Sequence, residues 1–201
     1  MVMKKKKRIG VYGGTFNPIH NGHIAIAQTM ISKGIVDEVW LLISPLNPFK
    51  VDATDILPDE ERLQLARLAL ADIPSVVASD YEFHLPRPSY TWNTLQSLSK
   101  DYPDCQFVLL IGADNWQAFD RWSHYQDILN HYSIVVYPRR DVDVDEAAMP
   151  QGVCLLDMPL IDLSSTAIRR SIRNRRTIRG MVPTQIETLC RNVYNNLFKQ
   201  L

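Results

Sequence analysis

Two histidines, three residues apart, follow a glycine pair near the start of the chain, in the segment GGTFNPIHNGH at residues 13–23. A spacing of three places the imidazoles of His20 and His23 toward one side of the first turn of a helix. The unpaired N–H groups of a helix N-terminus attract phosphates, and Gly13-Gly14 lets a ligand approach the backbone closely. The segment therefore predicts donors that stabilise the charge developing on phosphate oxygens during phosphoryl or nucleotidyl transfer.

Other ligands suit this glycine turn less well. A dinucleotide fingerprint reads GxGxxG, with an acidic residue about 20 positions later at the end of the second strand. Here the glycines are Gly10, Gly13 and Gly14, and the second apolar run ends at Ser44-Pro45. The segment departs from the pattern at both points, which disfavours a nicotinamide-dependent dehydrogenase.

The two histidines also allow plainer interpretations. A metal site is disfavoured because no third ligand follows at a useful spacing, so we expect no metal held by the protein alone. Taken singly, His20 is compatible with a loop residue and His23 with a helix-capping side chain. From the residues themselves these structural alternatives stay open.

A second candidate anion site lies in SSTAIRR at residues 164–170. Serine or threonine ahead of an apolar-periodic stretch is typical of a helix N-cap. Hydroxyl groups, free backbone N–H groups and the guanidinium of Arg169 would then converge at one helix end, where an anion is stabilised. Taken alone, an ordinary capped surface helix explains the segment at least as well.

The elements that must position these segments form an alternating pattern of strands and helices. Six short apolar runs rich in β-branched residues predict strands, and stretches with helical spacing, such as the stripe of Ile24, Ala27 and Ile31, separate most of them. Runs that are apolar throughout fit a parallel sheet covered on both faces. The expected strands are Arg8–Tyr12, Glu38–Ile43, Val76–Ser79, Gln106–Ile111, Ser133–Tyr137 and Val153–Leu156.

This order predicts a doubly wound, Rossmann-like α/β fold with a mainly parallel sheet, helices on both faces and right-handed crossovers. Residues 164–201 lack a convincing strand and predict a helical C-terminal segment of two helices, separated near Gly180–Pro183. No repeat or long linker divides the chain, so we expect residues 1–201 to form a single domain. Ligands of such sheets bind beyond the carboxyl ends of the strands.

The composition narrows the function classes. The chain has 201 residues, with 22 Lys and Arg balanced by 22 Asp and Glu, which argues against a broad nucleic-acid surface. No apolar run approaches the roughly 20 residues that span a bilayer, and we expect no secretory signal. Cys105, Cys154 and Cys190 form no close pair. We therefore expect reduced thiols in a cytoplasmic protein, with Cys105 and Cys154 inside strands.

The histidine segment closely resembles the phosphate-binding segment of the nucleotidyltransferase superfamily, whose (T/H)xGH motif matches residues 20–23. In that family the two histidines contact the nucleotide triphosphate, which implies a catalytic role for His20 and His23. The second segment resembles the SSTxIR motif with which adenylyltransferases hold ATP phosphates. The residues that the resemblance and their placement assign to ATP are Gly13, Gly14, Thr15, Phe16, Gly112, Asp114, Ser165, Thr166 and Arg169.

Three further segments favour one substrate. Pantetheine-phosphate adenylyltransferases share both phosphate motifs, but SYTWNTL at residues 89–95 resembles the SYTxDTL stretch of bacterial nicotinate-nucleotide adenylyltransferases. IGAD at residues 111–114, with Trp122 downstream, resembles their IGAD…W segment, and MVP at residues 181–183 resembles their LVP turn. The matches run in order from residue 13 to residue 183, nearly the whole chain.

In that family the pyridine ring stacks on an aromatic residue, and backbone N–H groups read its carboxylate. The resemblance places Thr91 and Trp122 in this pocket with Tyr90 nearby, and a flat ring suits a flat aromatic partner. The plainer alternative makes Trp122 and Tyr90 core aromatics and Asp114 a helix-capping residue. The residues assigned to nicotinate mononucleotide are Asn17, Lys50, Tyr90, Thr91 and Trp122.

Several positions depart from the family pattern. Asn17 and Asn93 stand where aspartate is usual, which keeps size and hydrogen bonding but removes charge. Phe49 replaces a histidine in the loop that carries Lys50, and residues 173–176 lack an expected glycine. None of these departures affects the two histidines or the SSTxIR helix.

The resemblance implies transfer of AMP from ATP to nicotinate mononucleotide, forming deamido-NAD and pyrophosphate, with Mg²⁺ bound along with ATP. The expected partners are these two small substrates, without nucleic acid or membrane, and the oligomeric state is open. An adenylyltransferase acting on nicotinamide mononucleotide or phosphopantetheine is one alternative. A non-catalytic nucleotide sensor is another, although loss of His20, His23 or Arg169 would be expected in a sensor, and all three are present.

Overall fold

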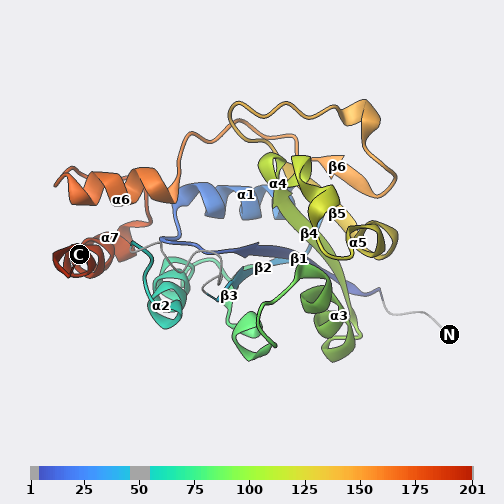
Figure 1. The fold of residues 1–201 in the computed structure, drawn as a ribbon, viewed down its shortest axis with the longest axis horizontal. Helices are drawn as coiled ribbons and strands as arrows, with labels where there is room; N and C mark the ends of the chain where they lie inside the picture. Colours follow the sequence, from blue (N-terminus) through green and yellow to red (C-terminus); the bar gives the residue numbers. More distant parts are fainter. Residues whose placement is uncertain (1–4, 46–54, 201) are drawn as a thin grey trace.

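A computed structural model describes residues 5–45 and 55–200 of the chain. Six strands form one all-parallel sheet in the order β3-β2-β1-β4-β5-β6 (Figure 1). The strand order reverses between β1 and β4, which creates a crevice at the carboxyl edge of the sheet. The strands are β1 Lys7–Gly14, β2 Glu38–Ile43, β3 Val76–Ser79, β4 Cys105–Gly112, β5 Ser133–Tyr137 and β6 Val153–Leu155.

These strands confirm the six that the sequence predicts, with differences only at their ends. β1 continues through Gly14, which pairs with Ile43 of β2, and β4 continues to Gly112, which pairs with Tyr137 of β5. The apolar pattern stops short of both glycines because a glycine has no side chain to bury. The ladder nevertheless runs on, so each glycine lies at the carboxyl edge of the sheet.

Alternate residues of each strand enter two hydrophobic clusters, one on each face of the sheet. On β1, Val11 belongs to one cluster and Tyr12 to the other, and Leu109 and Leu110 divide in the same way on β4. All four side chains are buried. Burial on both faces is the reason that these strands read as continuous apolar runs.

Helices cover both faces of the sheet, as predicted. The cluster that contains Tyr12 packs against α1, α2, α6 and α7, and the cluster that contains Val11 packs against α3, α4 and α5. Figure 1 shows α1 and α3 on opposite sides of the sheet. The helices are α1 Asn21–Ser32, α2 Asp59–Ala69, α3 Thr91–Asp101, α4 Ala113–Gln117, α5 Tyr125–His131, α6 Ser165–Arg173 and α7 Thr184–Lys199, with 3-10 helices η2 Tyr81–His84, η3 Phe119–Arg121 and η4 Glu146–Ala148.

The C-terminal segment forms two helices, α6 and α7, separated where the sequence predicts. Gly180 adopts a left-handed φ of 75° in the connection, and Arg179 bridges to Val182. α7 packs against α2 and α6 (Figure 1). α7 also reaches the loop that follows β1, where the Tyr194 hydroxyl donates to Asn17.

Two of the three cysteines lie in strands, as the sequence predicts. Cys105 lies in β4 and Cys154 in β6, and all three cysteines are free. Within residues 5–45 and 55–200, no helix is both long enough and apolar enough to cross a membrane.

Candidate active site

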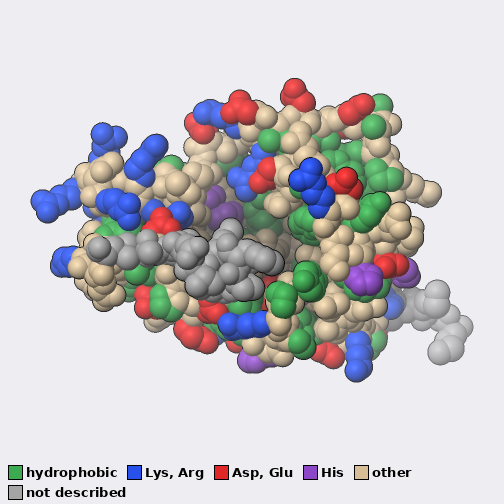
Figure 2. Space-filling view, viewed as in Figure 1, with side chains coloured by type: hydrophobic (Ala, Val, Ile, Leu, Met, Phe, Trp, Pro, Cys, Tyr) green, Lys and Arg blue, Asp and Glu red, His purple; other side chains and the backbone are tan. Residues whose placement is uncertain are grey.

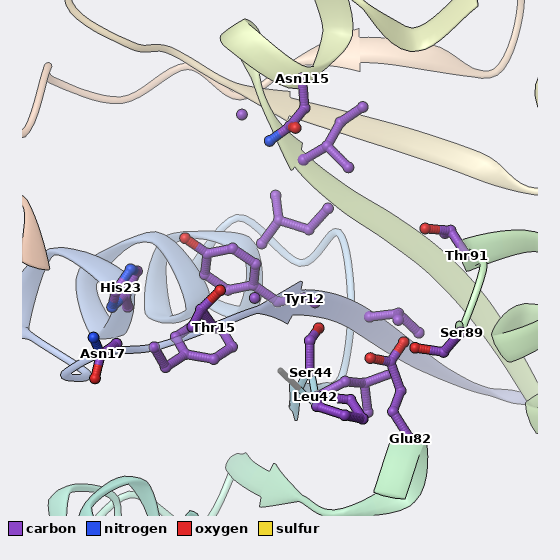
Figure 3. A pocket seen from close by; sticks show the side chains of 18 of the residues that line it. Tyr12, Thr15, Asn17, His23, Leu42, Ser44, Glu82, Ser89, Thr91 and Asn115 are labelled. Carbon is purple, nitrogen blue, oxygen red and sulfur yellow. The ribbon is translucent and has the colours of Figure 1, made fainter. Parts of the chain in front are cut away.

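A cavity of about 760 Å³ opens at the carboxyl edge of the sheet. Figure 3 shows His23 and Asn17 toward one end of it and Thr91 and Ser89 toward the other. Most residues that the sequence assigns to the two substrates line this cavity. They are Gly13, Gly14, Thr15, Phe16, Asn17, His23, Tyr90, Thr91, Gly112, Trp122, Ser165, Thr166 and Arg169.

Two of the predicted site residues do not line this cavity. His20 is 3% exposed and stacks on His23, beside a smaller space. Asp114 lies in the first turn of α4 without capping it; its side chain is 54% exposed and pairs with Arg139 at 3.5 Å. Lys50 and Phe49 lie outside the described residues. Asn93 is exposed on α3 and does not line the cavity, so its replacement of an aspartate leaves the lining unchanged.

His20 and His23 begin α1 by capping it reciprocally. His20 is the N-cap residue with an extended backbone; its Nδ1 accepts from the backbone N–H of His23 at 3.3 Å. The Nδ1 of His23 accepts from the backbone N–H of His20, also at 3.3 Å. A neutral imidazole whose Nδ1 accepts must carry its proton on Nε2. Capping therefore fixes the tautomer and keeps Nε2–H as a donor, so the capping and phosphate-binding interpretations are compatible.

Both histidines are neutral in the free protein. Burial is the main cause that lowers the pKa of His20 to about 3, and the positive charge of Arg139 acts in the same direction. Burial also holds the pKa of His23 well below its ordinary value, helped by His20 and Arg139. Two uncharged rings can stack with centroids 3.5 Å apart, an arrangement that two imidazolium ions would oppose.

The loop after β1 turns sharply at Phe16. Its backbone has a φ of 46°, in the left-handed region, and its ring packs edge-on against His23 at 4.9 Å. A side chain at Gly14 would meet the Phe16 ring at 3.1 Å, whereas one at Gly13 would meet nothing within 4 Å. Gly14 is thus needed for close packing, and Gly13 leaves open space at the cavity wall.

Asn17 joins this loop to two distant segments. Its Nδ2 donates to the carbonyl of Asp55 at 2.9 Å, and its Oδ1 accepts from the Leu57 N–H at 3.1 Å and the Tyr194 hydroxyl at 2.6 Å. A carboxylate would accept the last two bonds but could not donate to Asp55. The amide therefore suits this site, although the family often has aspartate there.

The start of α6 forms the second candidate phosphate segment. Ser164 is the N-cap residue and accepts from the Ala167 N–H at 3.2 Å, which confirms the predicted cap. Ser165 donates to the Pro18 carbonyl at 2.9 Å, which ties the helix to the loop after β1. The start of α6 therefore borders the cavity beside that loop.

Arg169 is the arginine of α6 that turns inward. Lys and Arg side chains gather on the surface over α6 (Figure 2), where Arg170 and Arg173 are exposed. The Arg169 side chain is only 15% exposed; its Nε pairs with Asp55 at 2.8 Å and its Nη1 donates to the Asn17 carbonyl at 2.8 Å. These bonds fix the guanidinium at the cavity before any ligand arrives.

The residues assigned to the pyridine ring lie at the start of α3 and after η3. Tyr90 is the N-cap residue of α3 and Thr91 its first residue, while Trp122 is the C-cap residue of η3. Tyr90 is 47% exposed, so it is not a core aromatic. Trp122 is partly buried and packs on Phe119 with centroids 5.2 Å apart, while it also lines the cavity. This position of Trp122 is compatible with both the packing role and the predicted role at the pyridine ring.

Several residues at the site were not predicted from the sequence. Glu82 is a buried carboxyl that accepts from the Thr94 hydroxyl at 2.9 Å, and burial raises its pKa. Arg139 and Tyr12 line the cavity wall near His23. Arg139 lies two residues after the end of β5, and the rule that ligands bind beyond strand ends could have indicated it. Glu82 and Tyr12 carry no comparable sequence signal.

Arg62 was also not predicted from the sequence. Its buried side chain binds the loops that surround the cavity. Its side chain is fully buried in α2. Its guanidinium donates to the carbonyls of Thr15 at 2.5 Å, Ser44 at 2.9 Å and Leu57 at 3.1 Å, and it pairs with Asp59. One buried cation thereby joins the ends of β1 and β2 to the segment before α2.

Comparisons with known proteins agree with this geometry. A family model described as cytidylyltransferase-like matches residues 11–171. Two relatives named probable nicotinate-nucleotide adenylyltransferase come from Bacteroides fragilis and Bacteroides thetaiotaomicron. The first is 46% identical over 87% of this chain and 86% of the relative, and the second is 41% identical over 89% and 88%.

Solved structures share the fold. The nicotinic acid mononucleotide adenylyltransferase of Plasmodium falciparum, complexed with NaAD, aligns with a TM-score of 0.78 and 18% identity over 94% of this chain and 98% of that one. A putative nicotinate-nucleotide adenylyltransferase from Vibrio parahaemolyticus aligns with a TM-score of 0.69 and 21% identity over 97% of each chain. The family model and the sequence relatives show that the chain belongs to the cytidylyltransferase-like family, among its nicotinate-nucleotide adenylyltransferases.

Proposed function

We propose that this protein transfers AMP from ATP to nicotinate mononucleotide, forming deamido-NAD and pyrophosphate. The observation that carries the proposal is one continuous cavity lined by His23, Arg169, Thr91 and Trp122. Figure 3 shows His23 and Thr91 toward opposite ends of it. A nucleotide triphosphate and a pyridine nucleotide must meet in such a space. The family membership of the chain supports the same two substrates.

The reaction needs no covalent intermediate on the protein. A phosphate oxygen of nicotinate mononucleotide attacks the α-phosphorus of ATP; the bond from that phosphorus to the bridging oxygen breaks, and pyrophosphate leaves with the electron pair. Catalysis then comes from holding the reactants in line and from stabilising negative charge as it shifts.

His23 and the start of α6 are placed to hold the triphosphate. His23 offers Nε2–H at the cavity wall, because its Nδ1 is occupied in the capping box. Ser165, Thr166 and Arg169 supply hydroxyl groups, helix N–H groups and a fixed guanidinium. His20 acts behind His23, as the residue that fixes its ring and tautomer.

The start of α3 is placed to hold the nicotinate group. Thr91 and the free N–H groups of the first turn can donate hydrogen bonds to a carboxylate. Trp122 offers a flat face for the pyridine ring. Tyr90, exposed at the rim, completes this end of the cavity. We keep Asn17, at the His23 end of the cavity, as a contact of nicotinate mononucleotide, and we place Asp114 near the ribose of ATP.

Mg²⁺ fits this site as a cation carried by the triphosphate. Among residues 5–45 and 55–200, no three His, Cys, Asp or Glu side chains are grouped to hold a metal. The described carboxyl groups that line the cavity are Asp55 and Glu82, and Asp55 lies on the phosphate side, bound to Arg169. Mg²⁺ is commonly held by phosphates, waters and one or two carboxylates. When bound, it would neutralise charge on the triphosphate.

We also infer a single domain, because the described strands share one sheet. The cytoplasm is the expected compartment, in keeping with three free cysteines.

Incubating the protein with ATP, Mg²⁺ and each acceptor in turn tests the proposed reaction. Pyrophosphate release and formation of deamido-NAD are expected with nicotinate mononucleotide. Adenylylation of phosphopantetheine alone would show that the role given to the start of α3 is wrong. ATP binding without turnover on any acceptor would instead support a nucleotide sensor.

A further inference from the structure

Two polar atoms at the cavity wall are buried without a hydrogen-bond partner in the protein. They are the hydroxyl oxygen of Tyr12, which has only the neighbouring Tyr137 beside it, and Nε of Arg139, which has only the Asp114 carboxylate 3.5 Å away; no other side chain that the structure describes carries such an atom. Both residues line the cavity, and Tyr12 is 3% exposed. A buried donor without an acceptor costs free energy. Two of them at one place point to a ligand that supplies the acceptors.

Both groups belong to one cluster of side chains at the ends of β1 and β5. Tyr12 packs edge-on against Tyr137 and His23, with ring centroids 5.6 and 6.0 Å apart. The Arg139 guanidinium lies over the Tyr137 ring, 5.0 Å from its centroid, and donates to its hydroxyl at 2.8 Å. Figure 3 shows the hydroxyl end of Tyr12 on the side of its ring nearer His23.

Arg139 gives this part of the wall a positive charge that is weakly compensated. Its ion-pair partner, Asp114, is 54% exposed and lies 3.5 Å from Nε, so water screens the pair. Arg169 differs, because its Nε is bound to Asp55 at 2.8 Å and its Nη1 to a backbone carbonyl. An anion entering the cavity would therefore meet less competition at Arg139 than at Arg169.

We propose that Tyr12 and Arg139 form an anion subsite with His23 and that this subsite binds phosphate oxygens of ATP. The Tyr12 hydroxyl, Arg139 Nε–H and His23 Nε2–H each donate to a phosphate oxygen. Ionised acceptors make the strongest hydrogen bonds with such donors. The choice of ATP as the source of the phosphate rests on the proposed function, whereas the preference for an anion follows from the donor set alone.

The Tyr12 hydroxyl is tested by Tyr12→Phe, with Tyr81→Phe as the matched control. The Tyr81 hydroxyl already donates to Asp101 at 2.6 Å, and Tyr81 does not line the cavity. ATP affinity is measured by titration calorimetry without an acceptor. Tyr12→Phe is expected to weaken ATP binding about tenfold, the typical value of a hydrogen bond to a charged group. Tyr81→Phe is expected to leave ATP affinity unchanged.

Thermal unfolding of the same variants separates ligand binding from a structural role. Removing a hydroxyl that has no partner should leave the melting temperature of Tyr12→Phe unchanged or raise it by about 2 °C. Removing a hydroxyl that is needed for folding would instead lower the melting temperature. A lower melting temperature with unchanged ATP affinity would overturn the proposal.

Arg139 is tested with pyrophosphate as the probe, using Arg139→Gln and the neighbouring Arg140→Gln. Arg140 pairs with Asp162 at 2.9 Å on the surface. Arg139→Gln is expected to weaken pyrophosphate binding about tenfold or more, and Arg140→Gln to leave it unchanged. Equal pyrophosphate binding by wild type and Arg139→Gln would overturn the proposal.

These binding tests are independent of the acceptor. If the wild-type protein binds ATP through Tyr12 and Arg139 but adenylylates no nicotinate mononucleotide, the proposed function fails and the subsite stands. If the wild-type protein makes deamido-NAD and both variants bind ATP as it does, the subsite fails alone.

Discussion

The imidazole rings of His20 and His23 stack with centroids 3.5 Å apart, and each Nδ1 accepts the backbone N–H of the other residue. The pair is a capping box made of two histidines, in positions more often taken by Ser or Thr and Glu. Because both Nδ1 atoms are occupied, both protons must lie on Nε2. The start of α1 thus sets the tautomer that a phosphate-binding imidazole requires.

Replacing His23 by alanine should abolish most of the activity without unfolding the protein. We expect turnover to fall by more than a hundredfold, because a donor to the shifting negative charge is lost. Loss of one capping bond should cost only about 1 kcal/mol of stability. Pyrophosphate release measures the first effect and urea denaturation the second. His84→Ala, at an exposed histidine, is the control, and an unchanged rate in His23→Ala would refute the assignment.

The buried histidines should make the protein less stable in mild acid. The folded pKa of His20 is about 3 and that of His23 is also well below 6.5, so the unfolded chain binds more protons below pH 6.5. The contribution of these two histidines to the free energy of unfolding is therefore largest above pH 6.5. It decreases as the pH drops from 6.5 toward 3. The expected slope is about 1 kcal/mol per pH unit for each histidine.

Urea denaturation from pH 7.5 to 4.5 checks this slope, with His20→Asn as the comparison. Asparagine is a good N-cap residue that does not titrate. The carboxyl groups are the same in both proteins, so their contribution cancels when the free energy of unfolding of His20→Asn is subtracted from that of the wild type. Parallel stability curves for wild type and His20→Asn would contradict a depressed pKa at His20.

Arg62→Ala should destabilise the protein strongly and disturb the cavity from a distance. The change removes the donor that holds the carbonyls of Thr15 and Ser44 and leaves Asp59 without this cation. Loss of one partner from a buried charged network costs about 3 kcal/mol or more. Arg67→Ala on the same helix should cost under about 1 kcal/mol, because Arg67 is more than half exposed. Urea denaturation compares them, and equal losses would contradict the role of Arg62.

Arg175 occupies a position that favours glycine, at the end of α6. Its φ is 56°, its N–H donates to the Ile172 carbonyl, and the Arg176 N–H donates to Ser171. These two bonds are a Schellman motif, in which glycine is usual. Arg175→Gly should therefore raise the free energy of unfolding by about 0.5–1 kcal/mol. Arg176→Gly should not, and a destabilised Arg175→Gly would show that the arginine side chain matters more than the backbone.

The fold was predictable from the sequence because parallel strands are buried on both faces. Each strand appears as a short run of apolar residues, and the glycines at the ends of β1 and β4 were missed only because they have no side chain to bury. The helix starts at Asn21 and Ser165 were predictable as well, since capping is a local property of the sequence.

The contacts that hold the site were not predictable in the same way. Arg62 looks like any charged residue of an amphipathic helix, and its burial depends on carbonyls of Thr15 and Ser44, which lie far away in the sequence. Asn17 likewise meets Tyr194 only after α7 folds back on the loop. Such residues are recognised from tertiary structure, because the groups that satisfy them come from other elements.

Trp122 should determine affinity for the pyridine nucleotide but not for ATP. Trp122→Ala removes the flat face at the α3 end of the cavity, and stacking of a base or a similar ring on an aromatic side chain is worth about 1–3 kcal/mol. We therefore expect the KM for nicotinate mononucleotide to rise about tenfold or more while the KM for ATP stays the same. Trp122→Phe keeps a flat ring and should retain most of the affinity. Steady-state kinetics with each substrate varied in turn distinguishes these outcomes. If both KM values rose together, or if Trp122→Phe were as impaired as Trp122→Ala, Trp122 would be supporting the packing around Phe119 rather than contacting the pyridine ring.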